Sequence, residues 1–147
     1  MFLRTALFAS ALALSAIAGA PAARADETGT LRIELSGLAP QGNIMLQVFN
    51  SEAGYGSGQG VTARRIAVDA ATESVQIDGL APGQYAVRLF HDVDGNGELN
   101  TNPFGIPTEP FAFSNNARGR FGPASWEQAA FTLNAGDNVQ AIAVGGQ

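Results

Sequence analysis

Short alternating apolar segments, separated by turn-forming clusters of glycine and proline, restrict this chain to a β fold. The first segment alternates strictly, with Leu31, Ile33 and Leu35 on one face, as a half-buried strand does. Residues 36–43 are rich in turn formers, and a second alternating segment follows at 44–49. We expect these two strands to pair as a hairpin.

The same pattern continues along the chain and predicts five more strands. They are expected at 61–68, 73–77, 85–90, 129–133 and 139–144. The last two are expected to form a closing pair across 134–138, and the glycine-rich segment 51–60 is expected to be a mobile loop. Short strands divided by turn signals in this way predict an all-β fold, a single β-sandwich of about seven strands.

Residues 100–127 interrupt this regularity, because they show little periodicity and contain four prolines. A loop of this length within a compact domain is usually functional or disordered. Six large apolar side chains argue against disorder, because we expect them to require burial: Phe104, Ile106, Phe111, Phe113, Phe121 and Trp126. We therefore predict a long ordered loop that covers the sandwich. The pattern Ser125-x-x-Gln128 matches a capping box and predicts one short helical turn.

The N-terminal residues 1–25 have the composition of a secretory signal peptide. Arg4 precedes an apolar stretch, and Ala23-Arg24-Ala25 has the small-x-small form of a cleavage site. This predicts an exported domain at 26–147, periplasmic or extracellular, without a membrane span. The chain has no cysteine, so the domain must be stable without disulfides.

The charge balance of that domain is acidic and limits its partners. Without Arg4 and Arg24, six arginines oppose 13 acidic residues, and lysine is absent, so the net charge is −7. Nucleic acids and anionic membrane surfaces are therefore poor candidates as partners. We expect the protein to be a monomer whose partner is an unknown protein or a carbohydrate.

The segment after the strand at 85–90 carries the most specific chemistry. Asp92, Asp94 and Asn96 occupy the first, third and fifth positions of a calcium-loop register, and a glycine follows at the sixth. Two further ligands are expected from the backbone carbonyl of Glu98 and from the side chain of Asn100. Oxygen ligands on alternate residues predict a Ca²⁺ site.

The register is incomplete, because Pro103 stands at the twelfth position, where a bidentate glutamate normally closes the site. Glu109 or Glu98 is then the candidate closing ligand, and the affinity should fall toward a Kd of about 10⁻⁴–10⁻³ M. The alternative is a turn without metal, because Asp, Asn and Gly side chains also stabilise turns through their own backbone.

His91 is the only histidine and precedes this loop, so it is a candidate binding residue, metal ligand or general base. One histidine without cysteine does not make a zinc site, and no nucleophile-elbow motif accompanies Ser114 or Ser125. A hydrolase using His91 and carboxylates is therefore the least favoured function. The alternative is a structural histidine at a strand end, and no catalytic residue is assigned.

The polar run 114–120 suggests a second binding surface. Asn115, Asn116, Arg118 and Trp126 are candidate contacts to a carbohydrate, because amides donate hydrogen bonds while aromatic rings stack on sugars. The alternative is that the asparagines cap backbone groups and that the aromatic side chains belong to the core.

Several of these motifs together resemble one family of exported bacterial proteins, catalogued as domain of unknown function 2141. The residues that carry the resemblance are His91-Asp92, 94–97, 104–110, 113–116 and Trp126-x-x-Ala129-x-Phe131. A looser similarity of 77–87 is to transthyretin-like and carboxypeptidase-regulatory-like domains. Both resemblances imply a prealbumin-like or immunoglobulin-like β-sandwich, and neither implies an activity.

These observations favour a non-enzymatic exported binding module with a weak structural calcium loop. A carbohydrate-binding accessory domain is the alternative. Exposed aromatic side chains in a row beside Asn115 and Asn116 would favour the carbohydrate, whereas buried aromatic side chains would favour a structural role.

Overall fold

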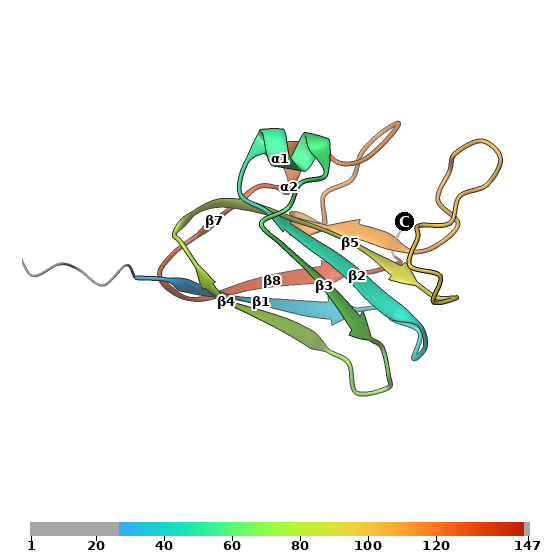
Figure 1. Cartoon of the computed structure of the whole chain (residues 1–147), viewed down its shortest axis with the longest axis horizontal. Coiled ribbons are helices and arrows are strands. Elements are labelled where there is room, and N and C mark those ends of the chain that lie inside the picture. Colours follow the sequence, from blue (N-terminus) through green and yellow to red (C-terminus); the bar gives the residue numbers. More distant parts are fainter. Residues whose placement is uncertain (1–26, 146–147) are drawn as a thin grey trace, which may run out of the picture.

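A computed structural model describes residues 27–145, and these residues form a β-sandwich of two sheets (Figure 1). The first sheet has the order β4-β1-β8; the second has the order β3-β2-β5-β6, and β7 also pairs with β5. The all-β sandwich is thus confirmed, with eight strands. Their bounds are β1 Gly29–Ser36, β2 Asn43–Phe49, β3 Thr62–Ala67, β4 Ser74–Leu80, β5 Gly83–Asp92, β6 Phe111–Phe113, β7 Phe131–Leu133 and β8 Gly136–Ala143. The signal peptide expected at 1–25 lies outside the described residues.

The core lies between the two sheets and follows the alternation of the sequence. Leu31 and Ile33 of β1 are fully buried and face the apolar side chains of β2 and β5. Successive side chains of a strand point to opposite faces, so the polar neighbours of these residues remain in water. An exposed ion pair on β1, between Arg32 and Glu34 at 3.6 Å, illustrates the outer face.

The predicted pairing of the first two strands is wrong, because β1 and β2 lie in different sheets. β1 pairs with β4 in an antiparallel and with β8 in a parallel arrangement, whereas β2 pairs with β3 and β5. The predicted closing pair is wrong for the same reason, since β7 pairs with β5 and β8 with β1. In both places the turn carries the chain from one sheet to the other.

The segment 51–60 was expected to be a mobile loop, but it contains the helix α1, Glu52–Ser57. The Ser51 hydroxyl accepts a hydrogen bond from Gly54 N at 3.1 Å and caps its first turn. Gly58 ends the helix with a φ of 75°, a left-handed conformation that favours glycine. The high glycine content of this segment led to the prediction of a loop, whereas the segment forms a capped helix.

The short helix α2, Trp126–Ala129, begins with the predicted capping box. Both reciprocal hydrogen bonds between Ser125 and Gln128 are present, so this prediction is confirmed. Figure 1 places α1 and α2 together over the outer face of the five-stranded sheet. A second apolar cluster joins them to the sheet, and it includes Phe49, Tyr55, Phe113, Ala129 and Trp126.

The long segment after β5 was predicted to be an ordered loop that covers the sandwich, and only part of it packs on the sandwich. It includes β6, the 3-10 turn η1 at Ser114–Asn116, and α2. Phe113 is buried, and Phe111 and Trp126 are half-buried, as expected. The expected burial of Phe104, Ile106 and Phe121 is wrong, because all three are exposed. They lie in two loops, 100–110 and 117–124, that project from the sandwich in Figure 1.

None of the helices in the described part of the chain is both long and apolar enough to cross a membrane.

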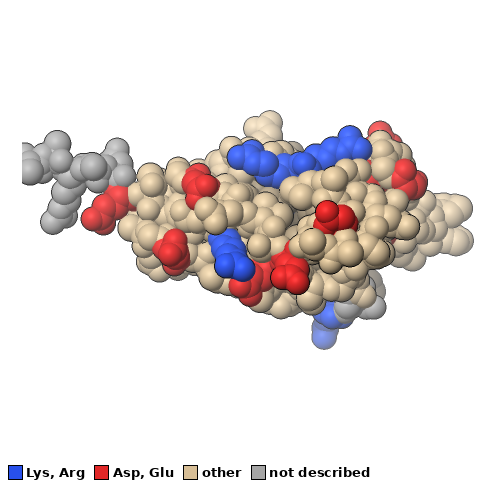
Figure 2. All heavy atoms as spheres, turned by 90° about the horizontal axis from the view of Figure 1, so that it is seen from below, with Lys and Arg blue, Asp and Glu red and all other residues tan. Residues whose placement is uncertain are grey.

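On the face drawn in Figure 2, basic side chains form separate small groups among acidic ones.

Candidate functional site

The candidate site begins where β5 ends, at Asp92. Strand alternation directs this side chain to the outer face of the five-stranded sheet, where the following loop buries it completely, with an exposed fraction of 0%. Its Oδ2 accepts a hydrogen bond from Gly97 N at 2.9 Å, whereas its Oδ1 is buried without a hydrogen-bond partner. A buried carboxylate oxygen left unpaired is costly, so this position requires a positively charged or donating partner.

The next residues fold back through a series of side-chain-to-backbone hydrogen bonds. Asp94 Oδ1 accepts from Asn96 N at 3.1 Å, and Asn96 Oδ1 accepts from Glu98 N at 2.8 Å. The Asn100 amide donates to Asp94 Oδ2 at 2.7 Å. Gly97 has a φ of 83°, which the turn requires and which side chains rarely adopt. The side-chain-to-backbone turn chemistry that the sequence offered as one alternative is therefore present in this loop.

Glu109 connects the two ends of the loop that starts here. Its exposed fraction is 8%, and its Oε1 accepts from Val93 N at 2.9 Å. Its Oε2 accepts from Asn100 N at 3.1 Å. Charged acceptors form the stronger class of hydrogen bonds, so this carboxylate fixes the loop to the end of β5.

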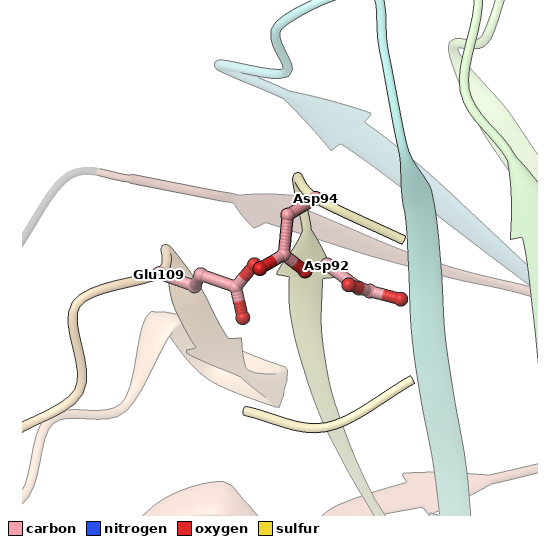
Figure 3. Close-up of side chains that lie close together, drawn as sticks. All are labelled: Asp92, Asp94 and Glu109. Carbon is pink, nitrogen blue, oxygen red and sulfur yellow. The ribbon is translucent and has the colours of Figure 1, made fainter. Parts of the chain in front are cut away.

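Three carboxylates thus converge at one point, as Figure 3 shows. Asp92, Asp94 and Glu109 each offer an oxygen, and these oxygens lie within 4.8 Å of one another. The amide of Asn100 and the backbone N–H of Asn96 hold the pKa of Asp94 below its ordinary value. An all-oxygen set with several carboxylates has the chemistry that Ca²⁺ prefers.

The other residues expected at this site take different positions. Glu98 is exposed, and its side chain is not among the three that converge, whereas the Glu109 side chain is. The side chains of Asn96 and Asn100 lie beside Asp94 and bond each other, with 2.6 Å between Asn96 Nδ2 and Asn100 Oδ1. Arg65 of β3 reaches the loop from the side and donates to Gly95 O at 3.2 Å, a contact that nothing in the sequence pattern indicated.

His91 does not join the three carboxylates. It precedes Asp92 on the same strand, so its side chain points to the opposite face of the sheet, where it is 1% exposed. Its Nε2 lies 2.7 Å from Gln41 O, and a carbonyl only accepts, so this nitrogen donates the hydrogen bond. The histidine therefore fixes the β1–β2 connection, and its expected role as a binding residue, ligand or base is not supported.

Ser114 also has a structural position. The Ser114 side chain is fully buried, and its hydroxyl donates to Ala129 O at 2.5 Å and accepts from Val87 N at 2.9 Å. It therefore joins α2 to β5.

Three of the residues expected to contact a carbohydrate, Asn115, Asn116 and Trp126, make contacts within the fold. Asn115 and Asn116 adopt left-handed conformations with φ of 59° and 49°. Asn115 Nδ2 donates to Ala130 O at 2.8 Å, and Asn116 Oδ1 accepts from Ala143 N at 2.9 Å. Trp126 packs edge-on against Tyr55, while Arg118 is exposed in the following loop. The asparagines thus cap backbone groups, and the aromatic side chains beside them are packed.

The sequence matches one family model, over residues 33–141. That family is described as uncharacterized protein conserved in bacteria, DUF2141, and the match covers both sheets and the three converging carboxylates. No curated protein and no solved structure shows significant similarity to the chain. The protein therefore belongs to the DUF2141 family of bacterial proteins.

Proposed function

We propose that this protein is an exported, monomeric, non-enzymatic binding module whose projecting loop 100–110 is held in place by Ca²⁺. Asp92, Asp94 and Glu109 are the ligands of the ion. The observation that carries the proposal is the fully buried Asp92 carboxylate, one oxygen of which has no hydrogen-bond partner. Export rests on the signal-like segment 1–25.

The energetic argument is that three neighbouring carboxylates repel one another unless a positive charge lies between them. Two of them, Asp92 and Glu109, are also buried, which raises the cost of leaving their charge uncompensated. The ion pair that the structure gives among residues 27–145, between Arg32 and Glu34, involves neither of them. A divalent cation offsets both costs.

The ion has a structural role because of where its ligands lie. Asp92 ends β5, and Glu109 stands just before β6, so one ion joins the two ends of the projecting loop. Only three carboxylates contribute, and the amide oxygens of Asn96 and Asn100 are engaged in hydrogen bonds. We therefore expect weak binding, with a Kd of about 10⁻⁴–10⁻³ M.

A non-enzymatic role is supported by the positions of the potential catalytic groups. The His91 side chain is engaged with Gln41 O and the Ser114 hydroxyl with Ala129 O, so both are committed to separate backbone hydrogen bonds. A carbohydrate surface at Asn115 and Asn116 lacks the exposed row of aromatic side chains that it requires, so the module is proposed to act through the projecting loops.

Calorimetric titration of the protein with Ca²⁺ tests the proposal. We expect one site in the submillimolar to millimolar range, lost in Asp92→Asn and in Asp94→Asn. The matched control is Asp69→Asn, because Asp69 also caps a turn, accepting from Ala71 N at 2.9 Å, but lies in the β3–β4 connection. The proposal fails if the protein shows no Ca²⁺ binding, or if all three variants bind alike.

A further inference from the structure

Three large apolar side chains on the two projecting loops are exposed, and the two phenylalanines among them are almost entirely so. The exposed fraction is 105% for Phe121, 88% for Phe104 and 59% for Ile106. Single exposed apolar residues are common on protein surfaces, as Val139 on β8 shows with 57%. Here, however, two of the three are phenylalanines at loop tips that project on the same side of the molecule in Figure 1.

The first loop holds its apolar side chains outward through its own hydrogen bonds. The Asn102 side chain accepts from Phe104 N at 2.9 Å and from Ile106 N at 3.1 Å. Thr101 and Pro107 form an isolated β-bridge at its base. The exposed positions are therefore fixed by a structured turn.

The second loop is compact for a different reason. A Cβ at Gly119 would lie 1.8 Å from Gly122 O, so only glycine permits the close approach of the two sides of the loop. The Tyr55 hydroxyl donates to Ala124 O at 2.7 Å and fixes the end of the loop to α1. Phe121 is thus presented at the tip of a tightly closed loop.

The charge of this region is opposite to that of the whole protein. Between Leu99 and Trp126 the charged residues are Glu109, which is buried, and the exposed Arg118 and Arg120. The full chain has a formal net charge of −5. Within this stretch both exposed charges are therefore positive, although the exposed Glu127 follows it and the net charge of the chain argues against an anionic partner.

We propose that the tips of loops 100–110 and 117–124 dock on a lipid bilayer that contains anionic headgroups. Phe121, Phe104 and Ile106 enter the boundary between headgroups and acyl chains, while Arg118 and Arg120 contact lipid phosphates. Aromatic side chains partition to this boundary, and guanidinium groups bind phosphate while their stems remain in apolar surroundings.

This proposal deepens the proposed function, because it rests on the protein being a binding module and names its partner. The part of the contact made by loop 117–124, with Phe121, does not depend on the ion, because the three carboxylates do not hold that loop. Phe104 and Ile106 lie in the loop that the proposed ion would fix, so the test in a chelator relies on Phe121.

Cosedimentation with phosphatidylcholine vesicles, with and without phosphatidylglycerol, tests the inference in the presence of a chelator. We expect binding to the vesicles with phosphatidylglycerol, weakened by salt. Phe121→Ser should lower the partition coefficient at least about tenfold, because it removes one aromatic side chain that would insert into the bilayer. Arg120→Gln should reduce the preference for phosphatidylglycerol. The matched control is Val139→Ser, which removes an exposed apolar side chain on a strand.

The inference is overturned if neither vesicle binds, if both bind equally, or if Phe121→Ser and Val139→Ser behave alike. A change in oligomeric state caused by Phe121→Ser would also overturn it, because the tip would then contact a second copy. The two proposals fail separately. Ca²⁺ binding without vesicle binding removes only the lipid proposal, and vesicle binding without Ca²⁺ binding removes only the calcium proposal.

Discussion

The carboxylate of Glu109 accepts a hydrogen bond from the backbone N–H of Asn100 at 3.1 Å, across nine positions of the chain. The same carboxylate accepts from Val93 N at 2.9 Å, so one side chain closes the base of the projecting loop. This arrangement gives Glu109 a role in stability even without metal.

Replacing Glu109 should therefore destabilise the metal-free protein. Glu109→Ala leaves two backbone N–H groups without their acceptor and should lower the free energy of unfolding by about 2 kcal/mol. Glu109→Gln keeps an acceptor oxygen and removes one of three repelling charges, so its effect should be smaller. Urea unfolding in a chelator measures both. Equal destabilisation by the two variants would contradict this role.

Asn115 should behave as a structural residue. Asn115→Ala removes the amide donors to two backbone carbonyls and places alanine at a φ of 59°, so we expect a loss of about 2 kcal/mol. Asn115→Asp should be at least as destabilising at neutral pH, because it sets a carboxylate against the same carbonyls. A surface ligand contact would instead leave the unfolding free energy of both variants near that of the parent protein.

Tyr55 gives the protein a defined response to alkaline pH. Burial raises the pKa of Tyr55 above its ordinary value of 10.0, and the nearby charge of Arg88 partly opposes this shift. The raised pKa means that the contribution of the neutral phenol to stability is complete below pH 10.0 and is lost as the pH rises through the folded pKa.

Tyr55→Phe should make stability less sensitive to alkaline pH. At neutral pH it should cost about 1 kcal/mol, because Ala124 O loses its donor. Absorbance titration of the two tyrosines, with chemical unfolding at each pH, measures these effects. A normal pKa for both tyrosines in the folded protein would contradict the interpretation.

The sequence predicted which residues face the core but not which strands pair. Alternation along β1 depends on local burial alone, whereas its partner β8 lies about 100 residues away. A turn such as 36–43 has the same composition whether it closes a hairpin or crosses between sheets. The hairpin prediction therefore failed although both of its strands were correct.

The part of the site that lies in one short segment could be predicted from the sequence, whereas the ligand from the far end of the loop could not be assigned with the same certainty of position. Asp92, Asp94 and Gly97 occupy one short segment, so their arrangement follows from local turn chemistry. Glu109 could be named only as a candidate closing ligand, because its approach depends on the path of a long loop. The exposure of Phe104 and Phe121 was missed because apolar composition is a one-way guide to burial.

The central claim, that Ca²⁺ occupies the three carboxylates, is tested most directly by thermal unfolding of the protein and of Asp92→Asn, each with millimolar Ca²⁺ and with a chelator. We expect Ca²⁺ to raise the Tm of the protein by about 4 °C, since a ligand that binds only the folded state stabilises it. Asp92→Asn should abolish this rise without lowering the Tm in chelator, because it removes a buried carboxylate of which one oxygen lacks a hydrogen-bond partner and keeps an oxygen that can accept from Gly97 N. An unchanged Tm of the protein on adding Ca²⁺, or an undiminished rise in Asp92→Asn, would contradict the account.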